Sequence, residues 1–156
     1  MYPEYLQKIL NDADKYFEAA NKSAQQFSPD PNVKVGVCLV NDSGFYVTSC
    51  NDIPDGVNKS ANRLVRPEKY YWIEHAERNV IYQTVKLGIS CDHYSFMFFS
   101  TAPTPCADCV RAIIQSGIKY LVGKKDNVKE FGDHWKETIE RGRIMLLEAG
   151  VETIVL

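Results

Sequence analysis

Two short runs of sequence organise the chain: Trp72-Ile73-Glu74-His75-Ala76-Glu77-Arg78 and Pro105-Cys106-Ala107-Asp108-Cys109. In shorthand they read H-x-E and P-C-x-x-C. One imidazole and two thiolates, from His75, Cys106 and Cys109, make a ligand set that zinc accepts. Three protein ligands leave the fourth tetrahedral position open, which is typical of a catalytic zinc site rather than a structural one.

The spacing of the two runs predicts how their side chains meet. The 31 positions from His75 to Cys106 hold one helix, one turn and one strand, so the chain returns to the same end of a sheet. Both residues are expected at helix starts, whose positive ends favour thiolate over thiol. Cys106 and Cys109 can reach one metal ion from a single helical turn, which Pro105 begins. Glu77, two residues past His75, is expected to face the open position and not the metal.

The two motifs together are a signature of zinc-dependent nucleobase deaminases. Zinc in such a site lowers the pKa of bound water towards about 7. Glu77 would take the proton of that water and hand it to the substrate as ammonia leaves. A lone C-x-x-C is often a redox pair or half of a structural zinc site, and a lone H-x-E arises by chance. Their conjunction at two helix starts is therefore what carries the interpretation.

Composition sets limits on the class of protein. A chain of 156 residues suits one domain spanning 1–156, with a core that needs no metal or disulfide to form. A net charge of −2 argues against a large nucleic-acid surface. Five cysteines do not indicate a disulfide framework, and no run resembles a signal peptide or a membrane span. We expect a soluble, reduced, cytoplasmic protein with no membrane partner.

The remaining cysteines and histidines attract simpler interpretations. Cys38 and Cys50 lie in apolar strand-like runs and are expected to be core residues. Cys91 and His93 form a Cys-x-His pair, which is more often a detail of a loop than a second metal site. His134 has no evident partner and is expected at the surface.

Hydrophobic periodicity predicts an α/β fold. The expected elements are a helix over 4–23, strands over 33–40 and 45–50, an irregular stretch over 51–71, a helix over 74–87, a strand over 94–101, a helix over 106–116, a strand over 118–122, a polar loop over 123–133, a helix over about 135–149 and a strand over 151–156. Strand–helix–strand units imply parallel pairing with helices on both faces. The prediction is a three-layer α/β/α fold around a five-stranded mixed sheet, with an opening antiparallel hairpin and the last two strands parallel.

From about Phe27 to Ile118 the chain resembles enzymes of the cytidine deaminase fold and, among them, the deoxycytidylate (dCMP) deaminases. The segments that carry the resemblance are Phe27–Gly36, Ser49–Val57, Arg63-Leu64 with Glu68-Lys69-Tyr70, His75–Asn79, Cys106–Cys109 and Ile113–Ile118. Three positions depart from the family pattern: Phe27 stands where some members carry Arg, Cys50 replaces a tyrosine and Asp52 replaces a glycine.

The resemblance implies one Zn²⁺ per chain, a nucleotide substrate and a homo-oligomer, commonly a hexamer, with dCTP and dTTP as possible effectors. By the family pattern Asn51 would bind the sugar or the base edge, and Ala76 is included among the substrate-binding residues. A structural role for an Asn in a turn is the alternative. Arg63, Arg66 and Lys69 are cations of the long loop that would hold a 5′-phosphate, although each alone is an ordinary surface charge.

Three functions follow in order of preference. The first is zinc-dependent hydrolytic deamination of dCMP to dUMP with release of ammonia, which supplies a dTTP precursor. The second is a deaminase of the same fold that acts on a nucleoside, a free base or a tRNA adenosine, and the acidic balance weighs against a polynucleotide. The third is a non-catalytic zinc module, which Glu77 and the open ligand position disfavour.

Overall fold

The computed structural model describes residues 3–125 and 132–156, without the side chains of His93 and Tyr94. Its centre is a mixed sheet in the order β2-β1-β3-β4-β5. The strands are β1 (Gly36–Asn41), β2 (Tyr46–Cys50), β3 (Tyr94–Phe99), β4 (Tyr120–Gly123) and β5 (Glu152–Val155). β1 runs antiparallel to both β2 and β3, whereas β3, β4 and β5 are parallel. The predicted hairpin and the parallel last pair are confirmed.

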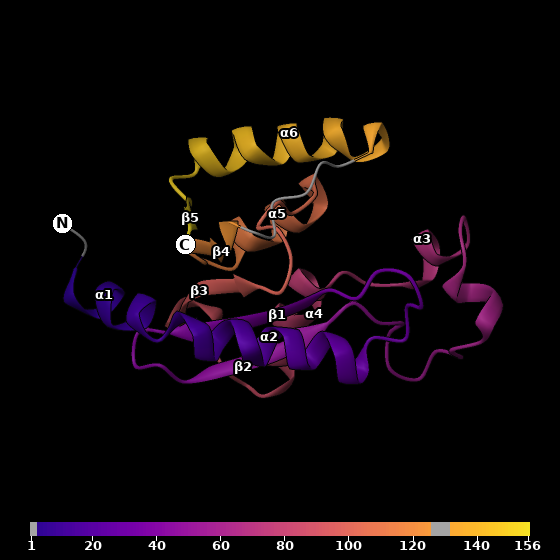
Figure 1. Ribbon diagram of the computed structural model, residues 1–156, viewed down its shortest axis with the longest axis horizontal. Helices are drawn as coiled ribbons and strands as arrows, with labels where there is room; N and C mark the ends of the chain where they lie inside the picture. Colours follow the sequence, from indigo (N-terminus) through magenta and orange to yellow (C-terminus); the bar gives the residue numbers. More distant parts are fainter. Residues whose placement is uncertain (1–2, 126–131) are drawn as a thin grey trace.

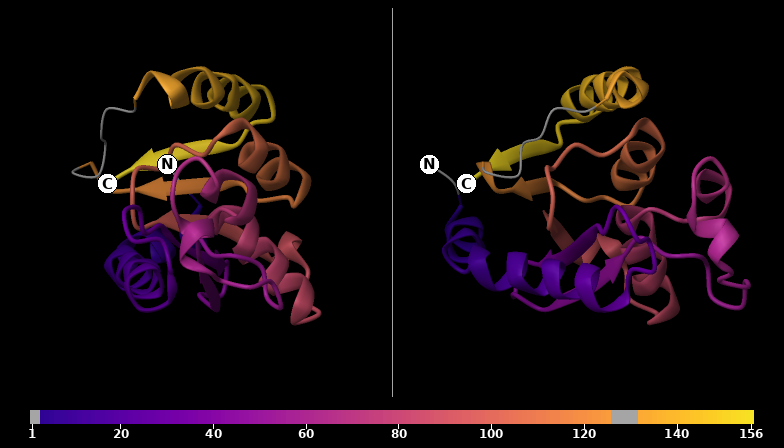
Figure 2. Two further views of the ribbon diagram at one scale, coloured as in Figure 1. Left: turned by 90° about the vertical axis from the view of Figure 1, so that its right-hand side faces the viewer. Right: turned by 45° about the vertical axis from the view of Figure 1, so that its right-hand side comes forward.

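Helices cover both faces of this sheet, as the left view of Figure 2 shows. The α-helices longer than one turn are α1 (Glu4–Asn11), α2 (Ala13–Phe27), α4 (Ala76–Lys86), α5 (Ala107–Gln115) and α6 (Asp133–Glu148). α1 and α2 pack on one face, and α4 and α5 pack on the other with α6 outside α5 (Figure 1). The three-layer α/β/α prediction is therefore confirmed.

The central strands are buried on both faces, which explains their unbroken apolar sequences. Along β3, Phe96 and Phe98 face α1 and α2, while Met97 and Phe99 belong to the cluster beneath α4 and α5. Cys38 of β1 lies fully buried among the first group, as expected. Because neither face can take a polar side chain, polar groups are displaced to the ends of these strands.

The first predicted helix was wrong in two respects. It is broken at Asp12, whose backbone (φ −94°, ψ 12°) leaves the regular helix, and its second part runs on to Phe27. Aspartate is a poor residue inside a helix because its carboxylate competes for nearby backbone groups. The extension follows from packing: α2 lies so close to β1 that a Cβ at Gly36 would be 1.8 Å from the carbonyl oxygen of Ala20.

The stretch predicted to be irregular contains two helical turns, η1 (Ala61–Leu64) and α3 (Lys69–Trp72). They form the projection at the right of Figure 1. An antiparallel bridge between Asp52 and Glu74 closes the whole excursion. It thereby delivers the chain to His75, which is the N-cap of α4, so the predicted place of His75 at a helix start is confirmed, although the helix begins at Ala76 and not at residue 74. Part of the polar loop predicted over 123–133 lies outside the described residues.

Throughout residues 3–125 and 132–156, no helix has the length and hydropathy of a membrane span.

The contact at Gly36 makes a prediction about stability. Gly36→Ala forces a methyl group against the backbone of α2, so we expect a loss of about 2 kcal/mol or more and a fall in Tm of about 4–8 °C. Gly132→Ala is the matched control, because no atom lies within 4 Å of a Cβ at that position. Thermal unfolding followed by circular dichroism measures both. Equal Tm values for the two variants would contradict the packing described.

Candidate metal centre and active site

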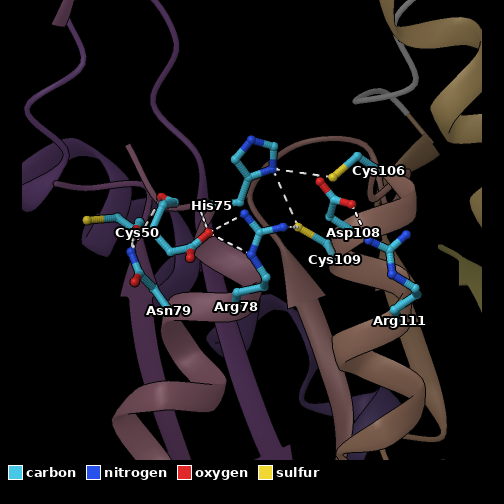
Figure 3. A network of polar contacts seen from close by, with 9 residues as sticks. Cys50, His75, Arg78, Asn79, Cys106, Asp108, Cys109 and Arg111 are labelled. Carbon is cyan, nitrogen blue, oxygen red and sulfur yellow. Dashed lines mark hydrogen bonds and ion pairs between the residues drawn. The ribbon is translucent and has the colours of Figure 1, made fainter. Parts of the chain in front are cut away.

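Three predicted ligands meet where two helices begin. His75 is the N-cap of α4, Cys106 is the N-cap of α5, and Cys109 lies in the first turn of α5. Nδ1 of His75 is 3.6 Å from Sγ of Cys106 and 3.4 Å from Sγ of Cys109. Figure 3 marks both contacts with dashed lines. Within the described part of the chain, this is the one group of three or more potential ligands that share such a space.

The separations fit a tetrahedral zinc ion. With Zn–S near 2.3 Å and Zn–N near 2.05 Å, a tetrahedral angle places nitrogen and sulfur about 3.6 Å apart. The two nitrogen–sulfur distances agree with that value. All three ligand atoms lie within 4.8 Å of one another, so one ion can touch them all.

Electrostatics at the two sulfurs also suits a cation. A hydrogen bond from Cys109, aided by His75, lowers the pKa of Cys106 to about 4 in spite of its burial. The same hydrogen bond, in which Cys109 keeps its proton, acts together with burial to raise the pKa of Cys109 well above its ordinary value. Two adjacent thiolates repel each other, and a divalent cation between them removes the repulsion.

A second layer of polar residues holds the ligands, and the sequence interpretation missed it. Arg78 places Nη1 3.6 Å from Sγ of Cys109, and its Nε donates to Oε1 of Glu74 at 2.6 Å. The same carboxylate oxygen accepts the backbone N–H of His75 at 2.9 Å. Figure 3 shows Asn79 beside these residues, where its Nδ2 donates to the carbonyl of Cys50 at 2.9 Å. The four-residue spacing of Glu74 and Arg78 was the available signal.

Glu77 is close to the ligands without being one of them. Its side chain is nearly buried, with 7% exposed, and it lines the same cavity as His75 and Cys106. Burial raises the pKa of its carboxyl group, although the positive charge of His75 works in the opposite direction. A carboxyl group with a raised pKa can both accept and return a proton near neutral pH.

The cavity beside the ligands has a volume of about 310 Å³. Its walls come from segments far apart in the sequence: Asp30, Val33, Val35, Asn51, Arg66, Lys69, Tyr70, Ile73, His75, Ala76, Glu77, Phe99, Thr101, Ala102, Thr104, Cys106, Trp135 and Ile139. Four of the five predicted substrate-binding residues are among them, namely Asn51, Ala76, Arg66 and Lys69. Arg63 is not.

Asn51 has a structural task as well as a place in the cavity wall. Its Oδ1 accepts from Oγ of Ser28 at 2.7 Å and from the N–H of Val35 at 2.9 Å. Its Nδ2 donates to the carbonyl of Val33 at 2.8 Å. These bonds tie the end of α2 and the entry to β1 against the end of β2. Both acceptor positions of the amide are used, and one N–H of Nδ2 remains beyond these three bonds.

Lys69 has a buried partner that the sequence did not reveal. Its Nζ is 2.6 Å from Oδ2 of Asp30, and the two side chains are 8% and 3% exposed. Oδ1 of Asp30 accepts the N–H groups of Asn32 and Val33. Burial alone would raise the pKa of Asp30, but these hydrogen bonds and the charge of Lys69 outweigh it and lower that pKa. The pair is neutral overall.

The two arginines differ in their surroundings. The guanidinium of Arg63 lies 3.8 Å from the ring centre of Trp72 and donates to the carbonyl of Asn58 at 2.9 Å. Arg66 is exposed at the cavity, with its guanidinium 6.0 Å from the ring centre of Tyr70. Among the residues described, Arg66 forms no ion pair. It is therefore available to an anion.

Aromatic residues of α6 reach the metal ligands. The ring of Trp135 lies 6.0 Å from that of His75. The rings of His134, Trp135 and Tyr70 form a cluster, with centre-to-centre distances of 5.0 Å for His134–Trp135, 5.6 Å for His134–Tyr70 and 6.3 Å for Tyr70–Trp135. His134 is exposed, as expected, but it has these two ring partners.

The other cysteines lie apart from this centre. Cys50 is buried, as expected, and Cys91 is buried with Sγ 2.8 Å from Oγ1 of Thr84. The side chain of His93 is outside the described part of the structure, so a second metal site there stays untested.

Residues 10–124 match the family described as the cytidine and deoxycytidylate deaminase zinc-binding region. Human deoxycytidylate deaminase is 30% identical over 147 residues, which cover 88% of this chain and 75% of the human protein. A probable deoxycytidylate deaminase of Drosophila melanogaster is 28% identical, covering 89% and 70% of the two chains.

Among solved structures, the apo dCMP deaminase of cyanophage S-TIM5 is 23% identical and covers both chains completely, with a TM-score of 0.68. It shares the fold. The matched region contains Glu77 and the three potential ligands His75, Cys106 and Cys109, which lie close enough together to hold one metal ion. On these grounds, the chain belongs to the cytidine and deoxycytidylate deaminase family.

Proposed function

We propose that the protein deaminates dCMP to dUMP with release of ammonia, using one zinc ion per chain held by His75, Cys106 and Cys109. The observation that carries the proposal is the three-ligand group with buried Glu77 beside it, both opening into one cavity. The names of the human protein and of the cyanophage enzyme support dCMP as the substrate. A crystal structure of the cyanophage enzyme in complex with dCMP and dUMP supports a nucleotide pocket in this fold.

In the reaction, the C–N bond to the exocyclic amine breaks, a C–O bond forms at the same ring carbon, and one water molecule is consumed. Zinc, when bound, supplies the Lewis acidity that makes water a nucleophile near neutral pH. The Glu77 carboxylate would take one proton from the water and pass it to the ring nitrogen of the base. It would then take the second proton, from the new C–OH group, and pass it to the amine, which leaves as ammonia while the C=O bond forms. Its buried position keeps bulk water from competing for that proton.

The base would be held by groups at the ends of two elements. Ala76 is the first residue of α4, so its backbone N–H has no partner within the helix and can donate to the base edge. Asn51 would offer the remaining N–H of Nδ2 to the sugar or the base. The volume of about 310 Å³ suits a single nucleotide and not a polymer.

For the 5′-phosphate, the contacts favour Arg66 over the other two cations. The charge of Lys69 is balanced by Asp30, and Arg63 is engaged with Trp72 and Asn58 outside the cavity lining. Arg66 stands at the cavity with an uncompensated charge and a fork of donors that suits a phosphate. Lys69 would then have a structural role, because its ion pair with Asp30 holds that part of the cavity wall in place.

We also propose that the protein forms a homo-oligomer, responds to dCTP and dTTP, is located in the cytoplasm and helps to supply dTTP precursors. Each is implied by membership of the family and by the composition of the chain.

The zinc assignment is tested by metal analysis. Purified protein is expected to contain about one zinc per chain, and Cys106→Ala is expected to lose it, because two ligands hold the ion far more weakly than three. Cys38→Ala is the matched control, since that buried thiol lies on the other side of the sheet. Full zinc content in Cys106→Ala would refute the ligand set.

Glu77→Gln separates proton transfer from metal binding. The amide keeps the size of the side chain but cannot carry a proton, so kcat is expected to fall by about 10²–10⁴-fold while zinc content stays unchanged. Ammonia release and metal analysis measure the two effects. Loss of zinc in this variant would make Glu77 a ligand and contradict the proposed mechanism.

Arg66→Gln tests the phosphate contact. Loss of one charge-assisted interaction worth about 1.5–3 kcal/mol is expected to lower kcat/KM on dCMP by about 10–100-fold, with no change on deoxycytidine. In the same assays Arg63→Gln should leave both values unchanged, and the wild type should prefer dCMP to deoxycytidine and to free cytosine. Equal kcat/KM on dCMP and deoxycytidine in the wild type would point to a nucleoside deaminase instead.

A further inference from the structure

The helix that carries two zinc ligands has an unusual N-terminal cap. Helices normally begin with Ser, Thr, Asp or Asn, whose side chain accepts a hydrogen bond from the first turn. The N-cap of α5 is Cys106, which has no oxygen to offer to the first turn and whose sulfur lies 3.6 Å from Nδ1 of His75. The first N–H groups of α5 therefore need acceptors from elsewhere.

Thr138 of α6 supplies one of them. The backbone N–H of Ala107, the first residue of α5, donates to Oγ1 of Thr138 at 2.9 Å, across 31 positions of sequence. The bond lies next to the Cα of Cys106 and is partly buried. It gives an acceptor to the first N–H of α5, which has no partner within the helix.

The packing of α6 on α5 brings this hydroxyl into reach. Four residues after Thr138, and on the same side of α6, stands Gly142. A Cβ there would lie 3.0 Å from Cγ2 of Val110 and 3.1 Å from the carbonyl oxygen of Pro105. The absence of that side chain lets α6 approach the start of α5 closely enough for the bond to form.

The same face of α6 also meets the other ligand helix. Trp135, three residues before Thr138, places its ring 6.0 Å from the imidazole of His75. α6 thus contacts both parts of the ligand set. The ring of Trp135 lies beside the imidazole of His75, and the hydroxyl of Thr138 bonds the helical turn that carries the two cysteines.

We propose that Thr138 is a positioning residue for the metal centre, whose hydroxyl orients the start of α5 so that Cys106 and Cys109 face His75. The inference rests on the zinc binding proposed above, and it concerns the affinity for zinc and not the identity of the substrate. Partners of this kind, one bond removed from the ligands, typically contribute about 10–100-fold to metal affinity.

The test compares Thr138→Val with Thr138→Ser in the full-length protein. Valine keeps the shape without the acceptor, so its zinc Kd, measured by competition with a chromophoric chelator, is expected to rise by about 10–100-fold. Serine keeps the acceptor and should stay within about threefold of the wild type. Thr138→Ala, on a half-exposed helix position that tolerates alanine, is expected to repeat the valine result.

Thr84→Val is the matched control for a general loss of stability. Its hydroxyl is fully buried and bonds the carbonyl of Ile81 and the thiol of Cys91, away from the metal ligands. This variant should lower Tm and leave the zinc Kd unchanged. The visible spectrum of the cobalt-substituted protein gives a second readout, in which only the Thr138→Val and Thr138→Ala bands should shift from those of the wild type.

A zinc Kd within threefold of the wild type in both Thr138→Val and Thr138→Ala would overturn the proposal, and so would an equal loss in Thr138→Ser. Because zinc affinity is measured without turnover, a protein that binds zinc but does not deaminate dCMP would refute the proposed substrate and leave this comparison decisive. A wild-type chain that binds no zinc would overturn the metal assignment and the role of Thr138 together.

Discussion

The structure depends on the meeting of two helix N-termini. His75 and Cys106 both adopt extended backbone just before their helices, with φ and ψ of −72° and 149° and of −67° and 164°. That conformation turns each side chain out of its helix and towards the other. Because α4 and α5 lie on one face of the sheet and share a core with it, a shift of either helix would separate nitrogen from sulfur. The rest of the molecule therefore serves to hold two helix starts in register.

The features that could be predicted from the sequence are those with a local pattern along the chain. The ligands and Glu77 lie in short motifs whose spacing reflects one helical turn, and such information is readable in order along the chain. The short apolar runs likewise made the strands visible, with ends within three residues of those observed. The break at Asp12 was missed because both helices present apolar residues to the same core, so the periodicity continues across it.

Long-range polar partners could not be predicted in this way. A lysine in a loop has the same local signature whether water or a carboxylate surrounds it, and the partner of Lys69 lies 39 positions away at Asp30. The hydrogen bond from the N–H of Ala107 to the hydroxyl of Thr138 likewise joins two helices, and the sequence of neither helix indicates it. Asn51 illustrates a third case: its amide makes the structural bonds that one interpretation predicted and also lines the cavity, while its role in binding stays a prediction.

The cavity also separates two kinds of task along the chain. The ligands and Glu77 lie between positions 75 and 109, whereas its walls draw on residues from Asp30 to Ile139. Wall residues that contact neither the ligands nor Thr138, such as Val33 at the entry to β1, can therefore be exchanged without changing the reactive groups. A library that randomises such wall positions outside residues 75–109 and outside α6 would sample new substrates while the ligands, Glu77 and their supporting contacts stay constant. In this fold, the residues that select the substrate can change separately, whereas the residues that carry out the reaction cannot.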